Sequence, residues 1–288
     1  MPVTKSVLRY PGGKTQLSEF VNHLITINNV ATPIFCVLFS GGSGVSMELL
    51  LSNRVNSIIL NDYDPAIYSI WHAIIHESGR LINDIQAIPI TMEEWYKQKN
   101  IYETLKSNQE YSYPLGFATL FLNRTNRAGI IMGGPIGGYK QESKYKLDCR
   151  FNKTNLCKKI SNIAAQAHRI QLYNYDAIDL IHNVLQQHNE QELFIFFDPP
   201  YYKQGSKLYK NAFTHDNHVT LYQAIREMDN YHWITTYDHC DEIASIYNNL
   251  PAHTYTLQYS AQIARKEREL LFASPITQLE SFDKVILT

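Results

Sequence analysis

The chain has 288 residues, 44% of them hydrophobic and 18% charged, and its formal net charge at pH 7 is −1. This length suits one large domain or a core domain with a smaller insert, and the near-zero charge argues against a uniformly basic nucleic-acid binder. No apolar run approaches the ~20 residues of a membrane span, and the N-terminus lacks an apolar signal-peptide core, so we expect a cytoplasmic protein without membrane contact.

The first predicted elements form a βαβ unit. An apolar strand over 34–39 runs into a glycine-rich turn and a helix. A second short strand, SIILNDYDP, ends at Asn61-Asp62, and a helix closed by Gly79 follows it. The order strand, turn, helix, strand indicates a parallel arrangement.

The middle of the chain has a different character. Residues 80–120 predict polar helices, whereas 123–153 are rich in glycine with weak periodicity and predict a loop-rich insert. Between residues 121 and 160 the lysines and arginines outnumber the acids, and the net charge of this stretch is +7. Such a stretch can face phosphates, and a solvated lysine-rich face is the alternative.

Strands alternate with helices again in the last part of the chain. An amphipathic helix is predicted over 152–170, and ARKEREL, residues 264–270, is expected to form a hairpin turn. The predicted strands are IQLYNYD, LFIFFDPP, HWITTYD, TYTLQYSA and RELLFAS, the last two forming a terminal hairpin. The predicted fold class is α/β: a Rossmann-like, mostly parallel sheet flanked by helices, with a helical and loop-rich insert.

The glycine-rich turn Phe39-Ser40-Gly41-Gly42-Ser43-Gly44 lies where a strand ends and a helix begins. Glycines at this place let the backbone approach a ligand without interference from side chains. Asp62 follows at the end of the next strand, where a carboxylate can accept hydrogen bonds from two ribose hydroxyls. The pair predicts a nucleoside cofactor, with a tight helix-packing turn as the alternative, and it does not separate a nicotinamide cofactor from S-adenosylmethionine.

The stretch FIFFDPPYYKQG makes that distinction. Asp198 ends a strand, and Pro199 and Pro200 stiffen the turn behind it. The carboxylate of Asp198 and the carbonyl of Pro199 can thus be held as two acceptors for one planar amino group, and Tyr201 offers a stacking face. Two fixed acceptors favour the pyramidal form of a purine amine, which is the form that attacks a methyl group. The alternative is a stiff loop with a solvated aspartate.

These motifs resemble the Dam-like family of DNA adenine-N6 methyltransferases. The matching stretches, in family order, are RYPGGK (9–14), FSGGSG (39–44), LNDYDP (60–65), NRTNRAG (123–129), RFNK (150–153) and DPPY (198–201). The resemblance implies transfer of a methyl group from S-adenosylmethionine to N6 of a flipped-out adenine in double-stranded DNA, which leaves S-adenosylhomocysteine. It also implies a catalytic domain over 1–75 and 160–288 and a target-recognition insert over 76–159.

The resemblance implies a role for each matching position. Tyr10 and Lys14 would line the methionine end of the cofactor, Asp62 would hold the ribose and Asp176 the adenine amine. The implied cofactor-binding positions are Tyr10, Gly12, Gly13, Lys14, Phe39, Ser40, Gly41, Gly42, Asp62, Asp176, Ala177 and Asp198. The implied catalytic positions are Asp198, Pro199, Pro200 and Tyr201. The family usually has glycine where Ser43 stands, so the path of the glycine turn is left open.

The insert supplies the expected DNA contacts. Arginine side chains can bind guanine edges or phosphates, and asparagine side chains can pair with an adenine edge or fill the gap left by a flipped base. The expected positions are Asn123, Arg124, Asn126, Arg127, Arg150, Asn152 and Lys153. No metal is expected, because the four cysteines form no CxxC pair and the histidines show no metal-ligand spacing.

Several alternatives stay open at this point. The same chemistry on RNA adenine or on cytosine N4 is the nearest competitor, although Asp198 favours adenine because cytosine-directed relatives more often have serine there. A catalytically silent DNA-binding protein on the same fold is the competitor outside enzymes. The expected partner is double-stranded DNA, bound by a monomer. A cognate restriction endonuclease and a solitary role both fit, and the recognition sequence does not follow from the residues.

Overall fold

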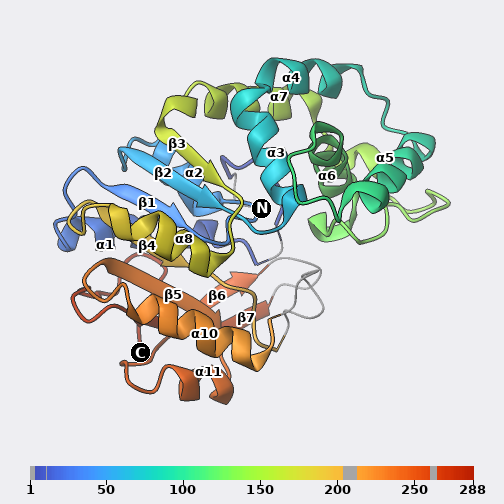
Figure 1. The fold of residues 1–288 in the computed structure, drawn as a ribbon. Coiled ribbons are helices and arrows are strands. Elements are labelled where there is room, and N and C mark those ends of the chain that lie inside the picture. Colours follow the sequence, from blue (N-terminus) through green and yellow to red (C-terminus); the bar gives the residue numbers. More distant parts are fainter. Residues whose placement is uncertain (1–3, 11, 204–212, 260–264) are drawn as a thin grey trace.

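A computed structural model describes residues 4–10, 12–203, 213–259 and 265–288. Within these ranges seven strands form one sheet in the order β3-β2-β1-β4-β5-β7-β6 (Figure 1). Neighbouring strands are parallel from β3 to β5, whereas β7 is antiparallel to both β5 and β6. The strands are β1 Ile34–Val37, β2 Ser57–Asn61, β3 Ile170–Tyr173, β4 Leu193–Phe197, β5 His232–Asp238, β6 His253–Tyr259 and β7 Arg265–Ala273. The prediction of a mostly parallel α/β sheet is confirmed.

Helices cover both faces of the sheet, and this explains its continuous apolar strands. Along β1 the side chains of Phe35 and Val37 pack into one core, and those of Cys36 and Leu38 pack into the other. Parallel strands buried on both faces need apolar residues at every position rather than at alternate ones. Helices α1 (Ser18–Ile27) and α2 (Gly44–Leu51) cover one face. The other is covered by α8 (Ala177–Asn183), α10 (His215–Arg226) and α11 (Asp241–Ile246) (Figure 1).

A helical excursion separates β2 from β3 (Figure 1). Its helices are α3 Pro65–His76, α4 Ser78–Ala87, α5 Met92–Leu105, α6 Tyr113–Thr125 and α7 Lys153–Ala164. The side chains of Asp64, Thr91 and Ser112 each accept a hydrogen bond from a backbone N–H of the first turn that follows, which starts α3, α5 and α6. Between α6 and α7 the chain forms short 3₁₀ turns at Arg127–Gly129 and Leu147–Arg150 and an isolated antiparallel bridge between Asn126 and Pro135, as the weak periodicity predicts.

The C-terminal hairpin differs from the prediction in one respect. A hairpin turn over 264–270 is wrong for residues 265–270, because these continue strand β7, and residues 260–264 lie outside the described residues. The predicted strands themselves are confirmed. The remaining short 3₁₀ turns are Thr15–Leu17, Ala167–Arg169 and Leu185–Gln187. In the described ranges, no helix combines the length and the hydrophobicity that crossing a bilayer requires.

Candidate active site

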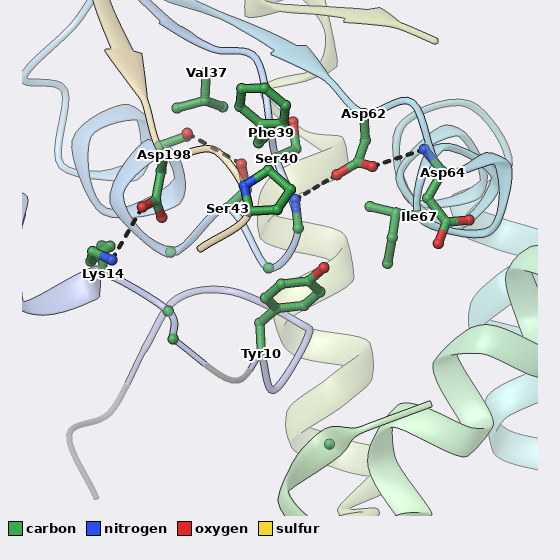
Figure 2. Close-up of a pocket in the computed structure, with 18 of the residues that line it drawn as sticks. Tyr10, Lys14, Val37, Phe39, Ser40, Ser43, Asp62, Asp64, Ile67 and Asp198 are labelled. Atoms are coloured by element: carbon green, nitrogen blue, oxygen red, sulfur yellow. Dashed lines mark hydrogen bonds and ion pairs between the residues drawn. The ribbon is translucent and has the colours of Figure 1, made fainter. Parts of the chain in front are cut away.

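The order of the strands reverses between β1 and β4. From β1 the chain continues to β2 and β3 on one side, whereas β4 and β5 lie on the other. Ligands of open parallel sheets bind outside the carboxyl ends of the strands where such a reversal occurs. A pocket opens at this place (Figure 2). Its walls include Tyr10, residues 12–14, 39–46, 62–64 and 129–132, Asp198 and Pro200.

The glycine turn after β1 is covered by the ring of Tyr10 (Figure 2). Gly41 has φ +43°, and a Cβ atom there would lie 2.7 Å from a ring carbon of Tyr10. A Cβ atom on Gly42 would lie 2.6 Å from Cβ of Tyr10. No side chain fits between the turn and the tyrosine, so this packing requires glycine at both positions. Pro11, in the same RYPGGK stretch, lies outside the described residues.

The backbone at Ser43 shows the path of the glycine turn at the position where the family usually has glycine. It adopts φ +47° and ψ +37° directly before α2, and its hydroxyl donates to the Ser46 hydroxyl over 3.2 Å. A residue with a Cβ atom in this left-handed conformation costs about 1–2 kcal/mol relative to the right-handed one. The turn therefore follows a path that glycine would adopt without strain, and serine is accommodated in it.

Asp62 follows β2 and lies beside the glycine turn in the wall of the pocket (Figure 2). Its Oδ2 accepts a hydrogen bond from the Gly41 N–H at 2.8 Å, and its Oδ1 accepts one from the Asp64 N–H at 3.0 Å. Burial raises the pKa of Asp62 to about 7, with the neighbouring Asp64 charge adding to the rise and the two N–H groups opposing it. A further hydrogen-bond donor from a ligand would therefore stabilise the ionised form of the Asp62 carboxylate.

Asp198 follows β4, and one of its carboxylate oxygens has two donors. The Thr236 hydroxyl, on β5, donates to Oδ1 at 2.8 Å. The Lys14 ammonium lies 3.1 Å from the same oxygen (Figure 2). The Lys14 side chain is 2% exposed. Burial raises the pKa of Asp198, and the ammonium of Lys14 lowers it in opposition. Both named donors use Oδ1, so the Oδ2 edge of the carboxylate is the one that a ligand can approach.

Tyr201 is held by its hydroxyl group. The hydroxyl donates to Oε1 of Glu269 at 2.6 Å and accepts from the Lys14 ammonium at 2.5 Å. Glu269 lies on β7 and is 1% exposed. The DPPY turn, the RYPGGK stretch and the C-terminal hairpin thus meet in one buried polar cluster, formed by Lys14, Asp198, Tyr201, Thr236 and Glu269.

The end of β3 contributes less to the pocket than expected. Asp176 and Ala177 lie at the same edge of the sheet but are not among the residues that line the pocket. The Asp176 carboxylate accepts the Ile178 N–H at 2.9 Å and caps α8. Asn61, the buried last residue of β2, connects the ends of neighbouring strands, since its amide donates to the carbonyls of Leu38 and Tyr175, each at 3.0 Å.

Two asparagines predicted to contact DNA lie in the interior. The Asn123 amide accepts from the Arg9 N–H and donates to the carbonyls of Arg9 and Gly129. The Asn126 amide accepts from the Trp95 indole at 2.7 Å and donates to two carbonyls, those of Ile130 and Ile131. Both residues are at most 1% exposed. They connect the insert to the Arg9 segment and shape residues 129–132, which line the pocket.

Three further predicted DNA contacts also bind the protein's own backbone. Arg124 donates to the carbonyls of Arg150 and Val7, and burial lowers its pKa to about 10. Lys153 donates to the carbonyls of Gln86 and Ile88, and Asn152 caps α7 through the Asn155 N–H. Arg127 and Arg150, by contrast, are exposed at the surface of the insert, as are Lys140 and Lys144.

Some residues of the site were not found from the sequence. Ile130, Ile131 and Met132 line the pocket from the insert, where weak periodicity offers no signal. Thr236 is one of two adjacent threonines in β5, and only the pairing of β4 with β5 brings it to Asp198. Glu269 lies where the predicted turn ARKEREL overlaps the predicted strand RELLFAS, and neither prediction marks it as part of the site.

Comparison with known proteins agrees with this arrangement. The D12 class N6 adenine-specific DNA methyltransferases match residues 10–263. This range includes the Tyr10 segment, the glycine turn after β1, the DPPY turn after β4 and the insert. The chain belongs to this family. It is an adenine-specific DNA methyltransferase, and DNA is its substrate.

Similar proteins include other methyltransferases. The Type II methyltransferase M.MjaIII of Methanocaldococcus jannaschii is 23% identical over 245 residues, covering 78% of this chain and 80% of the relative. Two structures of the rRNA methyltransferase aviRa from Streptomyces viridochromogenes each cover 93% of this chain and 88% of their own. Their TM-scores are 0.42 and 0.41 at 11% and 10% identity. Structural similarity at that level says nothing about the substrate of this methyltransferase.

Membership of the family implies S-adenosylmethionine as the methyl donor. The pocket has the features that such a group requires. The glycine turn presents backbone to the cavity, and Asp62 offers a carboxylate at the end of the neighbouring strand. Aromatic and apolar side chains, among them Phe39, Ile67 and Phe213, supply the walls for a purine ring.

Proposed function

We propose that the methyltransferase binds S-adenosylmethionine in this pocket and methylates a flipped-out adenine held by the DPPY turn. The observation that carries the proposal is the position of Asp198. Asp198 follows β4, where the strand order of the sheet reverses, and it lines the same pocket as Asp62 and the glycine turn. Its Oδ1 is occupied by donors from the protein. A cofactor placed against Asp62 and a base placed against Asp198 would share one cavity.

The proposed cofactor contacts follow from the pocket walls. Asp62 would accept hydrogen bonds from the ribose hydroxyls, and Tyr10, residues 12–14 and 39–42 would enclose the rest of the molecule. Asp176 and Ala177 remain proposed contacts of the adenine end, although they stand outside the pocket walls. S-adenosylmethionine supplies a methyl group on a sulfonium centre, which needs no metal for its transfer to an amine.

The pKa of Asp62 leads to a pH-dependent affinity for S-adenosylmethionine. Two ribose hydroxyls can donate to the carboxylate but only poorly to the protonated acid, so binding favours the ionised form. With a pKa of about 7 in the free protein, the affinity should fall as the pH drops below 7. The fall approaches a factor of about ten per pH unit. Isothermal titration calorimetry between pH 6 and 8 measures this directly.

The Asp62→Asn variant is the matched control for that experiment. It should bind more weakly at every pH and lose most of the pH dependence, because the titrating carboxyl is gone. A wild-type affinity that stays constant across the range would remove Asp62 from the ribose contact.

The chemistry at the DPPY turn depends on orientation. The lone pair of an adenine amine is delocalised into the ring, and this weakens the amine as a nucleophile. We propose that Oδ2 of Asp198 and the Pro199 carbonyl accept its two hydrogens, that Pro200 stiffens the turn, and that Tyr201 stacks on the base. Fixed acceptors in a water-poor pocket stabilise the attacking form without reorganisation.

The target base must leave the duplex to reach this pocket. Extrusion costs a few kcal/mol of stacking and pairing. We propose that the insert, residues 76–159, supplies the compensating contacts with double-stranded DNA through its exposed cations Arg127, Arg150, Lys140 and Lys144. Asn123, Arg124, Asn126, Asn152 and Lys153 would act mainly by holding the backbone that presents these cations. We propose that the chain acts on DNA as a monomer.

Mapping of modified bases tests the proposed function as a whole. We expect the genome of a host that expresses this chain to carry N6-methyladenine in one short sequence context, and none in a host that expresses Asp198→Ala. Protection of the same sequence from cleavage would support our further proposal of a cognate restriction endonuclease as partner. Modified cytosine, or methylation confined to RNA, would overturn the assignment of the substrate.

A further inference from the structure

Glu269 is a buried carboxylate for which the proposed function has no role so far. It lies on β7, is 1% exposed, and touches three polar groups. The Tyr201 hydroxyl donates to Oε1 at 2.6 Å, the Tyr255 hydroxyl donates to Oε2 at 2.6 Å, and the Lys14 ammonium lies 3.3 Å from Oε2. A buried charge is tolerated only when it is paired and hydrogen-bonded, and these contacts meet that requirement.

We propose that Glu269 is a positioning residue for methyl transfer, which fixes Lys14 and Tyr201 and through them the orientation of the Asp198 carboxylate. The proposal rests on the role of Asp198 and Tyr201 described above. Glu269 acts through its neighbours, because its carboxylate contacts Tyr201 and Lys14, and Lys14 in turn contacts Asp198. It therefore differs from the DPPY residues, which would contact the base.

The first part of the argument concerns Lys14, which bridges the two carboxylates. Its ammonium lies 3.1 Å from Oδ1 of Asp198 and 3.3 Å from Oε2 of Glu269. Without the charge of Glu269, the ammonium would have Asp198 as its remaining carboxylate in the cluster. It would bind Asp198 more tightly and compete with the target amine for that carboxylate. Glu269 thereby keeps Asp198 available as an acceptor.

The second part concerns Tyr201. Its hydroxyl contacts both Glu269 and Lys14, and these two contacts fix the direction of the tyrosine ring. A ring that is to stack on a flipped base has to hold its plane before the base arrives. Glu269 supplies the acceptor that holds the hydroxyl end of this ring.

The sheet explains why the carboxylate reaches this place. Glu269 pairs with Asp238 on β5 and with Tyr255 on β6, so its side chain is enclosed by both neighbouring strands. The adjacent Leu270 packs into the core on the opposite face. Since side chains alternate along a strand, Glu269 must face the same side as Tyr255, where Lys14 and Tyr201 lie.

The Glu269→Gln variant tests the proposal because it keeps the shape and removes the charge. We expect kcat to fall about 10- to 100-fold, with Kd values for S-adenosylmethionine and for DNA within about threefold of wild type. A second readout is the acid limb of the kcat–pH profile. Burial is the main cause that raises the pKa of Asp198, and the Glu269 charge adds to it. Removal of that charge should therefore move the limb to lower pH.

Two variants separate positioning from a merely structural role. Tyr255→Phe removes a hydroxyl that contacts Glu269 but leaves the Lys14 and Tyr201 contacts in place, so kcat and the acid limb should stay near wild type. Glu269→Asp keeps the charge and should leave the acid limb unmoved while lowering kcat less than Glu269→Gln does. If Glu269→Gln fails to fold, Glu269→Asp decides the question by itself, because its shorter side chain loosens the contacts with Lys14 and Tyr201. A lower kcat with wild-type Kd values for S-adenosylmethionine and DNA supports the proposal, and a wild-type kcat overturns it.

The outcomes distinguish this inference from the proposed function. Unchanged kcat and an unmoved acid limb in folded Glu269→Gln would overturn the role of Glu269 alone, provided that Asp198→Ala is inactive. Equal losses of kcat in Glu269→Gln and Tyr255→Phe, with no change in the pH profile, would show that Glu269 stabilises the structure without positioning the catalytic groups. Normal turnover by Asp198→Ala would instead remove the proposed catalytic role itself.

Discussion

The Asp198→Ala variant is expected to lose methyl transfer to duplex DNA while remaining folded and able to bind S-adenosylmethionine. Asp198 would supply one of the two acceptors that hold the target amine, and groups fixed in this way contribute about 10²–10³-fold to the rate each. The loss should be at least of that size. Transfer of a labelled methyl group under single-turnover conditions measures it without interference from product release.

The surroundings of Asp198 explain why the variant should fold. Its removal takes one carboxylate from Lys14, but the ammonium keeps Glu269 at 3.3 Å and the Tyr201 hydroxyl at 2.5 Å. The buried charge therefore stays paired. Asp198→Asn serves as the matched control, because it keeps the shape and replaces an acceptor by a mixed donor and acceptor. Near-normal turnover by either variant would contradict the proposed role of the carboxylate.

The Arg127→Glu variant should weaken binding to duplex DNA and flatten its salt dependence, while the affinity for S-adenosylmethionine is retained. Arg127 is exposed on the insert, at the 3₁₀ turn that leads into the pocket-lining residues 129–132. Each neutralised phosphate contributes about −0.9 to the slope of log K against log salt. The reversal should therefore lower the slope by about one unit. Fluorescence anisotropy with labelled duplexes at several salt concentrations measures both quantities.

Arg54→Glu is the matched control for Arg127→Glu. Arg54 is also exposed, and the substitution changes the net charge equally, but it lies between α2 and β2, at the opposite end of the strands from the pocket. Its DNA affinity should stay close to wild type. Equal effects of the two variants would indicate a general charge effect and would move the recognition surface away from Arg127.

Arg124→Glu does not provide an equivalent test, although Arg124 stands in the same NRTNR stretch. Its guanidinium is half-buried and donates to the carbonyls of Arg150 and Val7. A glutamate there would place a negatively charged carboxylate against carbonyl oxygens, and this repulsion would destabilise the insert. Weaker DNA binding by this variant would therefore mix misfolding with lost contacts, whereas the surface position of Arg127 avoids this problem.

The sequence by itself determined those parts of the structure that depend on residues adjacent in the chain. Apolar runs predicted the strands correctly, and glycines and prolines predicted the turns after β1 and β4, because these residues restrict the local backbone directly. The order of these elements was sufficient to predict a mostly parallel sheet. The family resemblance rested on the same short motifs, and the family match over residues 10–263 confirms it.

Only the tertiary structure decided which polar side chains line the pocket and which bind other parts of the protein. Asn123 and Asn126 are predicted to contact DNA from the sequence, but their amides bind backbone groups of the insert and of Arg9. Tyr201 reaches Lys14 and Glu269 across 187 and 68 positions of the chain. Such contacts are set by strand order and register, which no local pattern encodes. The polar cluster around Asp198 therefore forms only when the sheet is assembled, although the DPPY turn at its centre consists of four consecutive residues.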